Sequence, residues 1–384
     1  MLKQINRKPV FSAIGVLLVL LAVITLLSGC STARGAVARG WAGGVVADDI
    51  LFIGSMQGNL VSVNTTDGWL MMTVPLESQE ASTGFLSCAQ GSSAVAIYGS
   101  PTIAGDLVCV GGYNGKIYAF SREEMREEPR WVYPRQDTIG GSVIGSLVYD
   151  QGKLYFGAAN NKVFALDAAD GYKEWDVELG DMIWSTPAVS GDSLYIGCFD
   201  QKLYALDTAD GSTRWEFETE GAIVSSPVVS GNTVYIGSFD RYLYALDAAT
   251  GNLKWKFMAD NWFWASLLVH NNRIYAPCLD GKIYVLDTAD GTVIAEYNLE
   301  DPVSASPVII GDTIVAVTQQ GDIYAMDTAR DMYDKLASLE EAVFAPLIAG
   351  NGKVFVHTNL DTLYEVDART GAKREIDIKE EETE

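Results

Sequence analysis

Short segments in which apolar and polar residues alternate follow one another along almost the whole chain after residue 40. A representative unit contains four such segments, SSPVVS (225–230), TVYIGS (233–238), YLYALD (242–247) and LKWKF (253–257). A period of two is typical of β-strands with one buried face. Gly, Asn and Asp separate the segments, and these residues accept the backbone conformations of hairpin turns. The pattern predicts four short antiparallel strands per unit and no helix.

The third segment of this unit recurs at a fixed interval. Six copies end 40 residues apart: VFALD at Asp167, LYALD at Asp207, LYALD at Asp247, IYVLD at Asp287, IYAMD at Asp327 and LYEVD at Asp367. Looser copies, LVSVN and IYAFS, end at Asn64 and Ser121. A unit of this length cannot bury its apolar faces alone, so neighbouring units must stack. Four antiparallel strands form one blade, and blades repeated radially form a β-propeller.

The repeat therefore predicts an all-β, eight-bladed β-propeller over residues 41–379. The blades are expected at 41–77, 97–134, 144–179, 184–219, 224–259, 264–299, 304–339 and 344–379. Seven blades are the alternative if the first copy is degenerate. The last segment holds all four of its strands, which predicts that the ring closes by packing of the first blade against the last. Two longer connections, 78–95 and 122–130, are either functional loops or tolerated surface insertions.

The N-terminus has the layout of a secretory signal. Lys3, Arg7 and Lys8 precede an apolar run that ends in Leu-Ser-Gly-Cys at residues 27–30. This ending resembles the lipobox of bacterial lipoproteins, which implies a signal peptide over 1–29, lipidation of Cys30 and a tether over 30–40. An uncleaved transmembrane anchor is the alternative, since about 18 apolar residues can just span a bilayer. Both interpretations place the propeller outside the cytoplasm, attached to a membrane.

Charge and cysteine content narrow the range of partners. The chain carries 50 acidic and 27 basic residues, and residues 380–384 are expected to form an acidic tail. Such acidity repels nucleic acid, so no nucleic-acid partner is expected. Cys198 and Cys278 occupy the same position of repeats two apart, too distant to form a disulfide. Only Cys88 and Cys109 could pair.

A second motif, Ala-x-Asp-x-x-x-Gly-x-x-x-Trp, marks the turn between the third and fourth strands. Its three full copies are Asp167-Gly171-Trp175, Asp207-Gly211-Trp215 and Asp247-Gly251-Trp255. The motif resembles the tryptophan-docking motif of the quinoprotein (pyrroloquinoline-quinone-type) propellers. That resemblance implies that each Trp stacks on the motif of a neighbouring blade, and a buried indole N–H does need an acceptor. Later copies have Ala295, Leu336 and Glu375 at or near the Trp position, which predicts weaker contacts between the last blades.

The resemblance covers residues 41–379 and is specific for the fold rather than for one function. A lipobox followed by a propeller of this length resembles the BamB branch of the family, the lipoprotein subunit of the outer-membrane barrel-assembly machinery. That branch implies a non-catalytic scaffold that binds envelope proteins, such as a barrel-assembly subunit, without a cofactor. It would lie on the periplasmic face of an outer membrane, or on the outer face of the cell membrane where there is only one. The alternatives are a quinone-binding oxidoreductase or sensor, with pyrroloquinoline quinone and Ca²⁺, and a propeller for an unrelated peptide or polysaccharide.

The residues offer little for catalysis. The sequence contains no Gly-rich phosphate loop, Cys-x-x-Cys or His-Glu-x-x-His pattern. The Asp-x-x-Asp-Gly turns are explained by hairpin chemistry and are too short for a Ca²⁺ loop, so no metal site is expected. The two histidines, His270 and His357, are expected in turns or at the surface.

A better candidate site lies in the loops that join the fourth strand of one blade to the first strand of the next. Each loop begins with acidic residues and continues with apolar or aromatic ones. The candidate partner-binding residues are Asp181, Trp184, Asp260, Trp262, Phe263 and Trp264. In a propeller these loops share one face, so an acidic rim would surround aromatic groups at the channel mouth, as is typical of protein-binding surfaces. Alternatively, Trp184, Trp264 and Phe344 begin inner strands and only pack against neighbouring blades; Trp262 is the strongest candidate.

Overall fold

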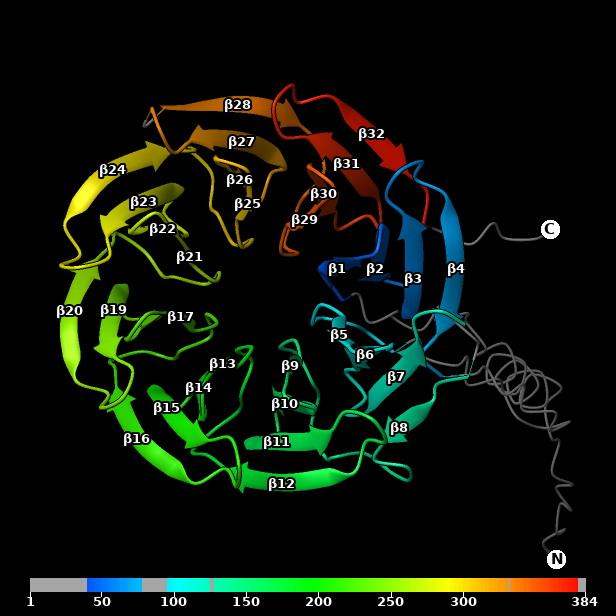
Figure 1. Ribbon diagram of the computed structural model, residues 1–384. Coiled ribbons are helices and arrows are strands. Elements are labelled where there is room, and N and C mark those ends of the chain that lie inside the picture. The colour runs from blue at the N-terminus through cyan, green and yellow to red at the C-terminus, as the bar shows by residue number, and fades with distance from the viewer. Residues whose placement is uncertain (1–39, 78–94, 125–127, 331, 379–384) are drawn as a thin grey trace, which may run out of the picture.

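Eight four-stranded antiparallel sheets form a closed ring (Figure 1). The computed structural model describes residues 40–77, 95–124, 128–330 and 332–378. In each sheet the four strands are consecutive in sequence, with the first at the centre and the fourth at the rim. The prediction of an eight-bladed β-propeller is confirmed, and the seven-bladed alternative is wrong. Across the described residues every element is a strand, and no helix is long and apolar enough to cross a membrane.

The first four blades follow the chain in order. Blade 1 comprises β1 (Gly44–Ala47), β2 (Ile50–Gly54), β3 (Asn59–Asn64) and β4 (Leu70–Pro75). Blade 2 comprises β5 (Thr102–Ala104), β6 (Leu107–Gly111), β7 (Ile117–Ser121) and β8 (Trp131–Tyr133). Blade 3 comprises β9 (Val148–Asp150), β10 (Lys153–Gly157), β11 (Lys162–Asp167) and β12 (Lys173–Glu178). Blade 4 comprises β13 (Ala188–Ser190), β14 (Ser193–Gly197), β15 (Lys202–Asp207) and β16 (Thr213–Glu218).

The remaining four blades complete the circle. Blade 5 comprises β17 (Val228–Ser230), β18 (Thr233–Gly237), β19 (Tyr242–Asp247) and β20 (Leu253–Met258). Blade 6 comprises β21 (Leu268–His270), β22 (Arg273–Pro277), β23 (Lys282–Asp287) and β24 (Val293–Asn298). Blade 7 comprises β25 (Val308–Ile310), β26 (Thr313–Val317), β27 (Asp322–Asp327) and β28 (Met332–Ser338). Blade 8 comprises β29 (Ile348–Gly350), β30 (Lys353–His357), β31 (Leu363–Asp367) and β32 (Lys373–Ile376).

The antiparallel order assigns every connection to one of two faces of the ring. The loops between blades and the turns between second and third strands lie at one edge of each sheet; we call this the loop face. The hairpins between first and second strands and the turns between third and fourth strands lie at the other edge, the turn face. The middle strands are almost fully buried between neighbouring blades, and these contacts form the core.

Four tryptophans of the outer strands connect blades 2 to 6 on the turn face. The indole N–H groups of Trp131, Trp175, Trp215 and Trp255 donate to the carbonyl oxygens of Ala168, Thr208, Ala248 and Thr288 in the next blade, each at 3.1 Å. Each ring lies against the motif glycine of that blade, where a Cβ would collide with the indole; these are Gly171, Gly211, Gly251 and Gly291. The motif aspartates Asp167, Asp207 and Asp247 accept backbone N–H bonds within their own turns. Trp131 was not among the predicted residues, because the 122–130 insertion separates it from its motif.

We call each contact surface between neighbouring blades a seam, and the other seams have different residues at the tryptophan position. Met72 occupies it in blade 1, since Met72 pairs with Ser62 as Trp175 pairs with Ala165. In blade 8 the residue is Arg374 rather than the expected Glu375, because the outer strand lacks the bulge of the earlier blades and its register moves by one. The Arg374 guanidinium lies against Gly68 of blade 1 and donates to the Asp67 carbonyl, so it takes the place of an indole.

The ring closes by packing of β1 against β29, as the four-stranded last segment predicted. A buried His357–Asp361 pair connects these blades. His357 Nδ1 lies 3.0 Å from the Ala42 carbonyl oxygen, and Nε2 lies 2.9 Å from Asp361 Oδ1, which also accepts the Met56 N–H at 2.9 Å. The expectation that His357 is a turn or surface residue is therefore wrong: its side chain is buried at the closing seam.

Several predicted features lie outside the described residues. These are the signal peptide 1–29, Cys30, nearly all of the tether, Cys88, most of the 78–95 insertion and the acidic tail 380–384.

Candidate functional site

Eight equivalent residues, one from the start of each blade, line the channel mouth on the loop face. They are Trp41, Tyr98, Ile144, Trp184, Val224, Trp264, Ser304 and Phe344. Seven of them stand four residues before the first paired residue of the inner strand, and Trp41 stands three before Gly44, so the repeat itself brings the set together. Five of the eight are aromatic. The small cavity that they border, about 110 Å³, lies at the centre of the ring (Figure 1).

Aromatic side chains spread from the mouth onto the surrounding loops over blades 4 to 6. Trp262 and Trp264 both stack on Phe239, with ring centroids 4.9 and 5.7 Å apart from it. Trp184 contacts Trp264 at 6.5 Å and Phe199 edge-on at 4.8 Å. We call Trp184, Phe199, Phe239, Trp262 and Trp264 the aromatic cluster. Trp262 is 46% exposed although it is stacked, so it presents a large apolar area in a fixed orientation.

The six predicted binding residues do not all reach this surface. Trp184, Trp262 and Trp264 belong to the aromatic cluster. The prediction that Phe263 contacts a partner is wrong, because its side chain is fully buried in a core cluster between blades 5 and 6. Trp262 and Trp264 share one side of the loop, so the residue between them must point to the other, and here that side is the core.

The two predicted acidic residues lie on the loop face, outside the set of residues that line the mouth. Asp260 is largely exposed and lies 3.5 Å from Lys282 Nζ. Asp181 is half-buried and accepts the backbone N–H of Met182 at 2.7 Å. Asp260 therefore offers a negative charge to the solvent, whereas Asp181 is partly used in shaping its own loop.

A repeated carboxylate contact fixes the loops beneath the aromatic cluster. Asp240 Oδ2 accepts the Tyr244 hydroxyl at 2.7 Å and the Glu220 N–H at 2.9 Å, so it joins a blade to the loop that enters that blade. Asp200 and Asp280 make the same pair of contacts in blades 4 and 6. Burial, followed by this hydrogen bond to a carboxylate, raises the pKa of Tyr244 above its usual range. The tyrosine therefore stays a neutral donor, and the loop is held by a charge-assisted bond.

A belt of hydroxyl groups lies just below the mouth. The backbone N–H groups of Ser100, Ser146, Thr186 and Ser266 donate to the side-chain hydroxyls of Ser146, Thr186, Ser226 and Ser306, each in the following blade, at 2.9 to 3.1 Å. These bonds connect inner strands that make no sheet contact with one another. The belt gives the mouth a rigid floor.

Two polar atoms at the mouth have no hydrogen-bond partner among the residues that the structure describes. They are Trp184 Nε1, a donor, and Ser304 Oγ, which can donate and accept; both are buried. A buried polar group without a partner costs about 1–3 kcal/mol. A bound molecule that supplied a carbonyl or hydroxyl here would recover part of that cost, so the mouth is suited to polar as well as apolar contacts.

The residues that sequence reasoning missed are Trp41, Tyr98, Phe199 and Phe239. Trp41 packs edge-on against Tyr98 at 4.7 Å and faces Phe344 at 6.2 Å, which makes a second aromatic group at the mouth. The 40-residue period would have found Phe199 and Phe239, since both occupy the same turn position 40 residues apart. Tyr98 follows Trp41 by 57 residues rather than 40, because the long insertion lies between them and breaks the period.

The cysteines and histidines that the structure describes are buried or in contact with a neighbouring group. Burial raises the pKa of the Cys109, Cys198 and Cys278 thiols to about 12, so these free cysteines stay protonated. His270 Nε2 contacts the neighbouring Asn271 amide. Across the part of the chain that the structure describes, no three His, Cys, Asp or Glu side chains group as metal ligands.

Comparison with known proteins places the chain in a family. A family model described as "Outer membrane protein assembly factor BamB" matches residues 27–182 and 173–376, which is most of the sequence. The outer membrane protein assembly factor BamB of Taylorella asinigenitalis is 31% identical over 122 residues, which are 31% of this chain and 28% of that protein. The chain thus aligns with less than a third of the length of this relative.

Solved structures share the fold. BamB from Moraxella catarrhalis superposes with a TM-score of 0.68 at 16% identity, over 84% of this chain and 95% of that one. The computationally designed Ika8 protein superposes with a TM-score of 0.69 at 14% identity, over 89% of this chain and 97% of that one. At such identities the likeness concerns the propeller alone. The family match and the blade-by-blade repeat together show that the chain belongs to the BamB family of PQQ-like β-propellers.

Proposed function

We propose that the protein is a non-catalytic, lipid-anchored scaffold that binds partner proteins of the cell envelope through the loop face of its propeller. The proposed role resembles that of BamB, outer membrane protein assembly, with a barrel-assembly subunit as partner. The observation that carries the proposal is the aromatic cluster at the channel mouth. Family membership supports the general role, and the geometry of the loop face supports the mode of binding.

The aromatic cluster has the makeup of an interface centre. Tryptophan is enriched among the residues that dominate binding energies, and it contributes most where it is well packed and can be fully desolvated. Trp262 is exposed, yet its ring is held by Phe239 and its loop by Asp280, whose side chain bonds the Asp260 N–H at 3.3 Å. A fixed side chain loses little conformational freedom on binding, so more of the contact energy appears as affinity.

The acidic residues around the aromatic cluster, which we call the rim, support specificity for one kind of partner. Asp260 and Glu220 are exposed beside the aromatic cluster, and they would favour a partner whose matching surface is basic. The chain's net charge of −23 adds long-range attraction for such a partner. No cofactor enters this proposal, and no residue of the loop face is assigned to chemistry.

The proposal is tested by pull-down with the tagged full-length protein from detergent-solubilised envelopes. We expect the wild-type protein to recover a barrel-assembly component, and recovery should fall as salt is raised because the rim is charged. Recovery of other envelope proteins without any barrel-assembly component would contradict the proposed role.

The proposed anchor makes a separate prediction. The full-length protein should incorporate an alkyne fatty acid, and Cys30→Ala should abolish the labelling, because the thiol of residue 30 is the acceptor. Cys198→Ala provides the matched control, since its buried thiol stays protonated and should not react. Labelling that persists in Cys30→Ala would contradict the anchor.

A further inference from the structure

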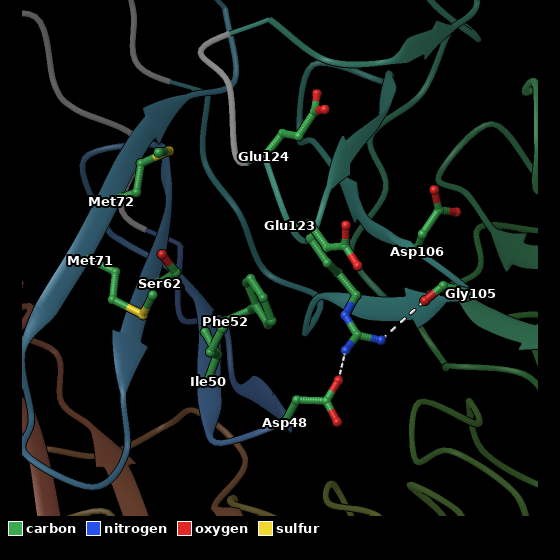
Figure 2. A pocket seen from close by; sticks show the side chains of 11 residues that line it. Asp48, Ile50, Phe52, Ser62, Met71, Met72, Gly105, Asp106, Glu123 and Glu124 are labelled. Carbon is green, nitrogen blue, oxygen red and sulfur yellow. Dashed lines mark hydrogen bonds and ion pairs between the residues drawn. The ribbon is translucent and has the colours of Figure 1, made fainter.

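A pocket of about 560 Å³ lies on the turn face, between blades 1 and 2. Figure 2 shows Ile50, Phe52, Met71 and Met72 on the blade 1 side, facing the acidic side chains of blade 2. Its size is within the range of sites that bind small ligands or single side chains. The pocket lies on the opposite face from the aromatic cluster, so it is independent of the proposed function.

The pocket occupies the space that a docked tryptophan fills at other seams. Tyr155, Ala165 and Trp175 share one face of blade 3, and the indole of Trp175 covers the turn of blade 4. Phe52, Ser62 and Met72 hold the corresponding positions in blade 1, and all three line the pocket. Met72 has a narrow, unbranched side chain in place of the wide indole ring, and the space that an indole would fill is left open.

The described part of the facing wall shares one backbone contact with a docking turn. The Arg122 N–H donates to the Asp106 carbonyl at 2.9 Å, as the Thr208 N–H donates to that of Asp192 at 3.0 Å. Arg122 therefore stands where Thr208 does, and the Thr208 carbonyl accepts the indole N–H of Trp175. The pocket thus has an apolar floor together with the backbone position that accepts an indole N–H elsewhere in the ring.

The rim of the pocket is acidic. Of the residues that the structure describes, four carboxylates line it, those of Asp48, Asp106, Glu123 and Glu124, together with the guanidinium of Arg122. That guanidinium is already bound, to the Asp48 carboxylate and to the Gly105 carbonyl (Figure 2). Asp106 and Glu123 are exposed. The electrostatic field at the entrance therefore favours a cation.

We propose that this pocket binds an aromatic side chain, a tryptophan above all, carried on a basic segment of a partner protein. The indole would occupy the space left by Met72, with its N–H directed to the backbone of the blade 2 turn, and flanking lysines or arginines would face Asp106 and Glu123. Two observations select this occupant. The acidic entrance is complementary in charge to a basic segment, and tryptophans fill the equivalent space at four other seams of the same ring.

The test uses three peptides titrated into the full-length protein by calorimetry: acetyl-Lys-Trp-Lys-amide, acetyl-Glu-Trp-Glu-amide and acetyl-Lys-Ala-Lys-amide. We expect the Lys-Trp-Lys peptide to bind at least about tenfold more tightly than either control, because only it offers both the ring and the charge. Equal affinities for the three peptides, or no binding of any, would overturn the proposal.

Met72→Trp restores the residue that the other seams carry. It should fill the pocket and weaken binding of the Lys-Trp-Lys peptide at least about tenfold, whereas Met258→Trp, which adds a tryptophan at an exposed outer-strand position, should leave binding unchanged. Unchanged binding in a folded Met72→Trp variant would overturn the proposal. If that variant does not fold, the double variant Asp106→Lys with Glu123→Lys, both at exposed positions, takes its place. It should also weaken binding of the Lys-Trp-Lys peptide at least about tenfold, and unchanged binding would overturn the proposal. Concentration-dependent dimerisation that Met72→Trp removes would instead assign the pocket to a second copy of the chain.

Discussion

His357→Leu is expected to lower the free energy of unfolding by about 3–5 kcal/mol. Both ring nitrogens of His357 lie within hydrogen-bond distance of an acceptor, the Ala42 carbonyl oxygen or Asp361 Oδ1, so the side chain joins blade 8 to blade 1 and pairs with a buried carboxyl group. Leucine has a similar volume but no donor. Among the described residues, Asp361 would then keep only the Met56 N–H, because its other oxygen has no partner there. The measurement is chemical denaturation followed by circular dichroism.

The double variant His357→Leu with Asp361→Asn is the control. Asparagine removes the buried charge, keeps an acceptor for Met56 and tolerates the left-handed backbone at residue 361, where φ is 61°. We expect it to recover much of the stability lost in His357→Leu, because an unpaired buried charge costs more than the absence of the pair. A single variant as stable as the wild type would show that the pair does not hold the closing seam.

Trp175→Ala is expected to cost about 3–5 kcal/mol, the usual range for truncating a buried tryptophan. The indole is only 8% exposed, it lies on Gly211 and its N–H donates to the Thr208 carbonyl, so alanine leaves both a cavity and a carbonyl without its partner. Denaturation under the same conditions measures the loss.

Trp69→Ala is the matched control for that variant. Trp69 also belongs to the turn face, but it is 73% exposed, and its truncation should change stability by no more than about 0.5 kcal/mol. If Trp175→Ala and Trp69→Ala were equally mild, tryptophan docking would not hold the blades together.

The sequence predicted the features that depend on local spacing. The blade count follows from a strand phrase repeated every 40 residues, and the position of Trp175 follows from its distance to Gly171 within one turn. Such features need no knowledge of distant contacts. The outer strand of blade 8 shows the limit, because the loss of one bulge moved the docking position from Glu375 to Arg374.

The features that the sequence did not reveal depend on residues far apart in the chain. His357 is buried because Ala42, 315 residues earlier, closes the ring against it. Trp41 and Tyr98 reach the channel mouth across an insertion that breaks the period. For Phe263, alternation separated it from Trp262 and Trp264 but could not say which side was the core.

The affinity of the full-length protein for a purified barrel-assembly partner, measured for Trp262→Ala against Trp69→Ala, tests the central claim most directly. Both variants remove an exposed tryptophan, one from the loop face and one from the turn face. We predict that Trp262→Ala loses at least about 2 kcal/mol of binding free energy, roughly 30-fold in affinity, while Trp69→Ala binds as the wild type does. Wild-type affinity in Trp262→Ala, with a loss in Trp69→Ala, would contradict the assignment of the loop face as the binding surface.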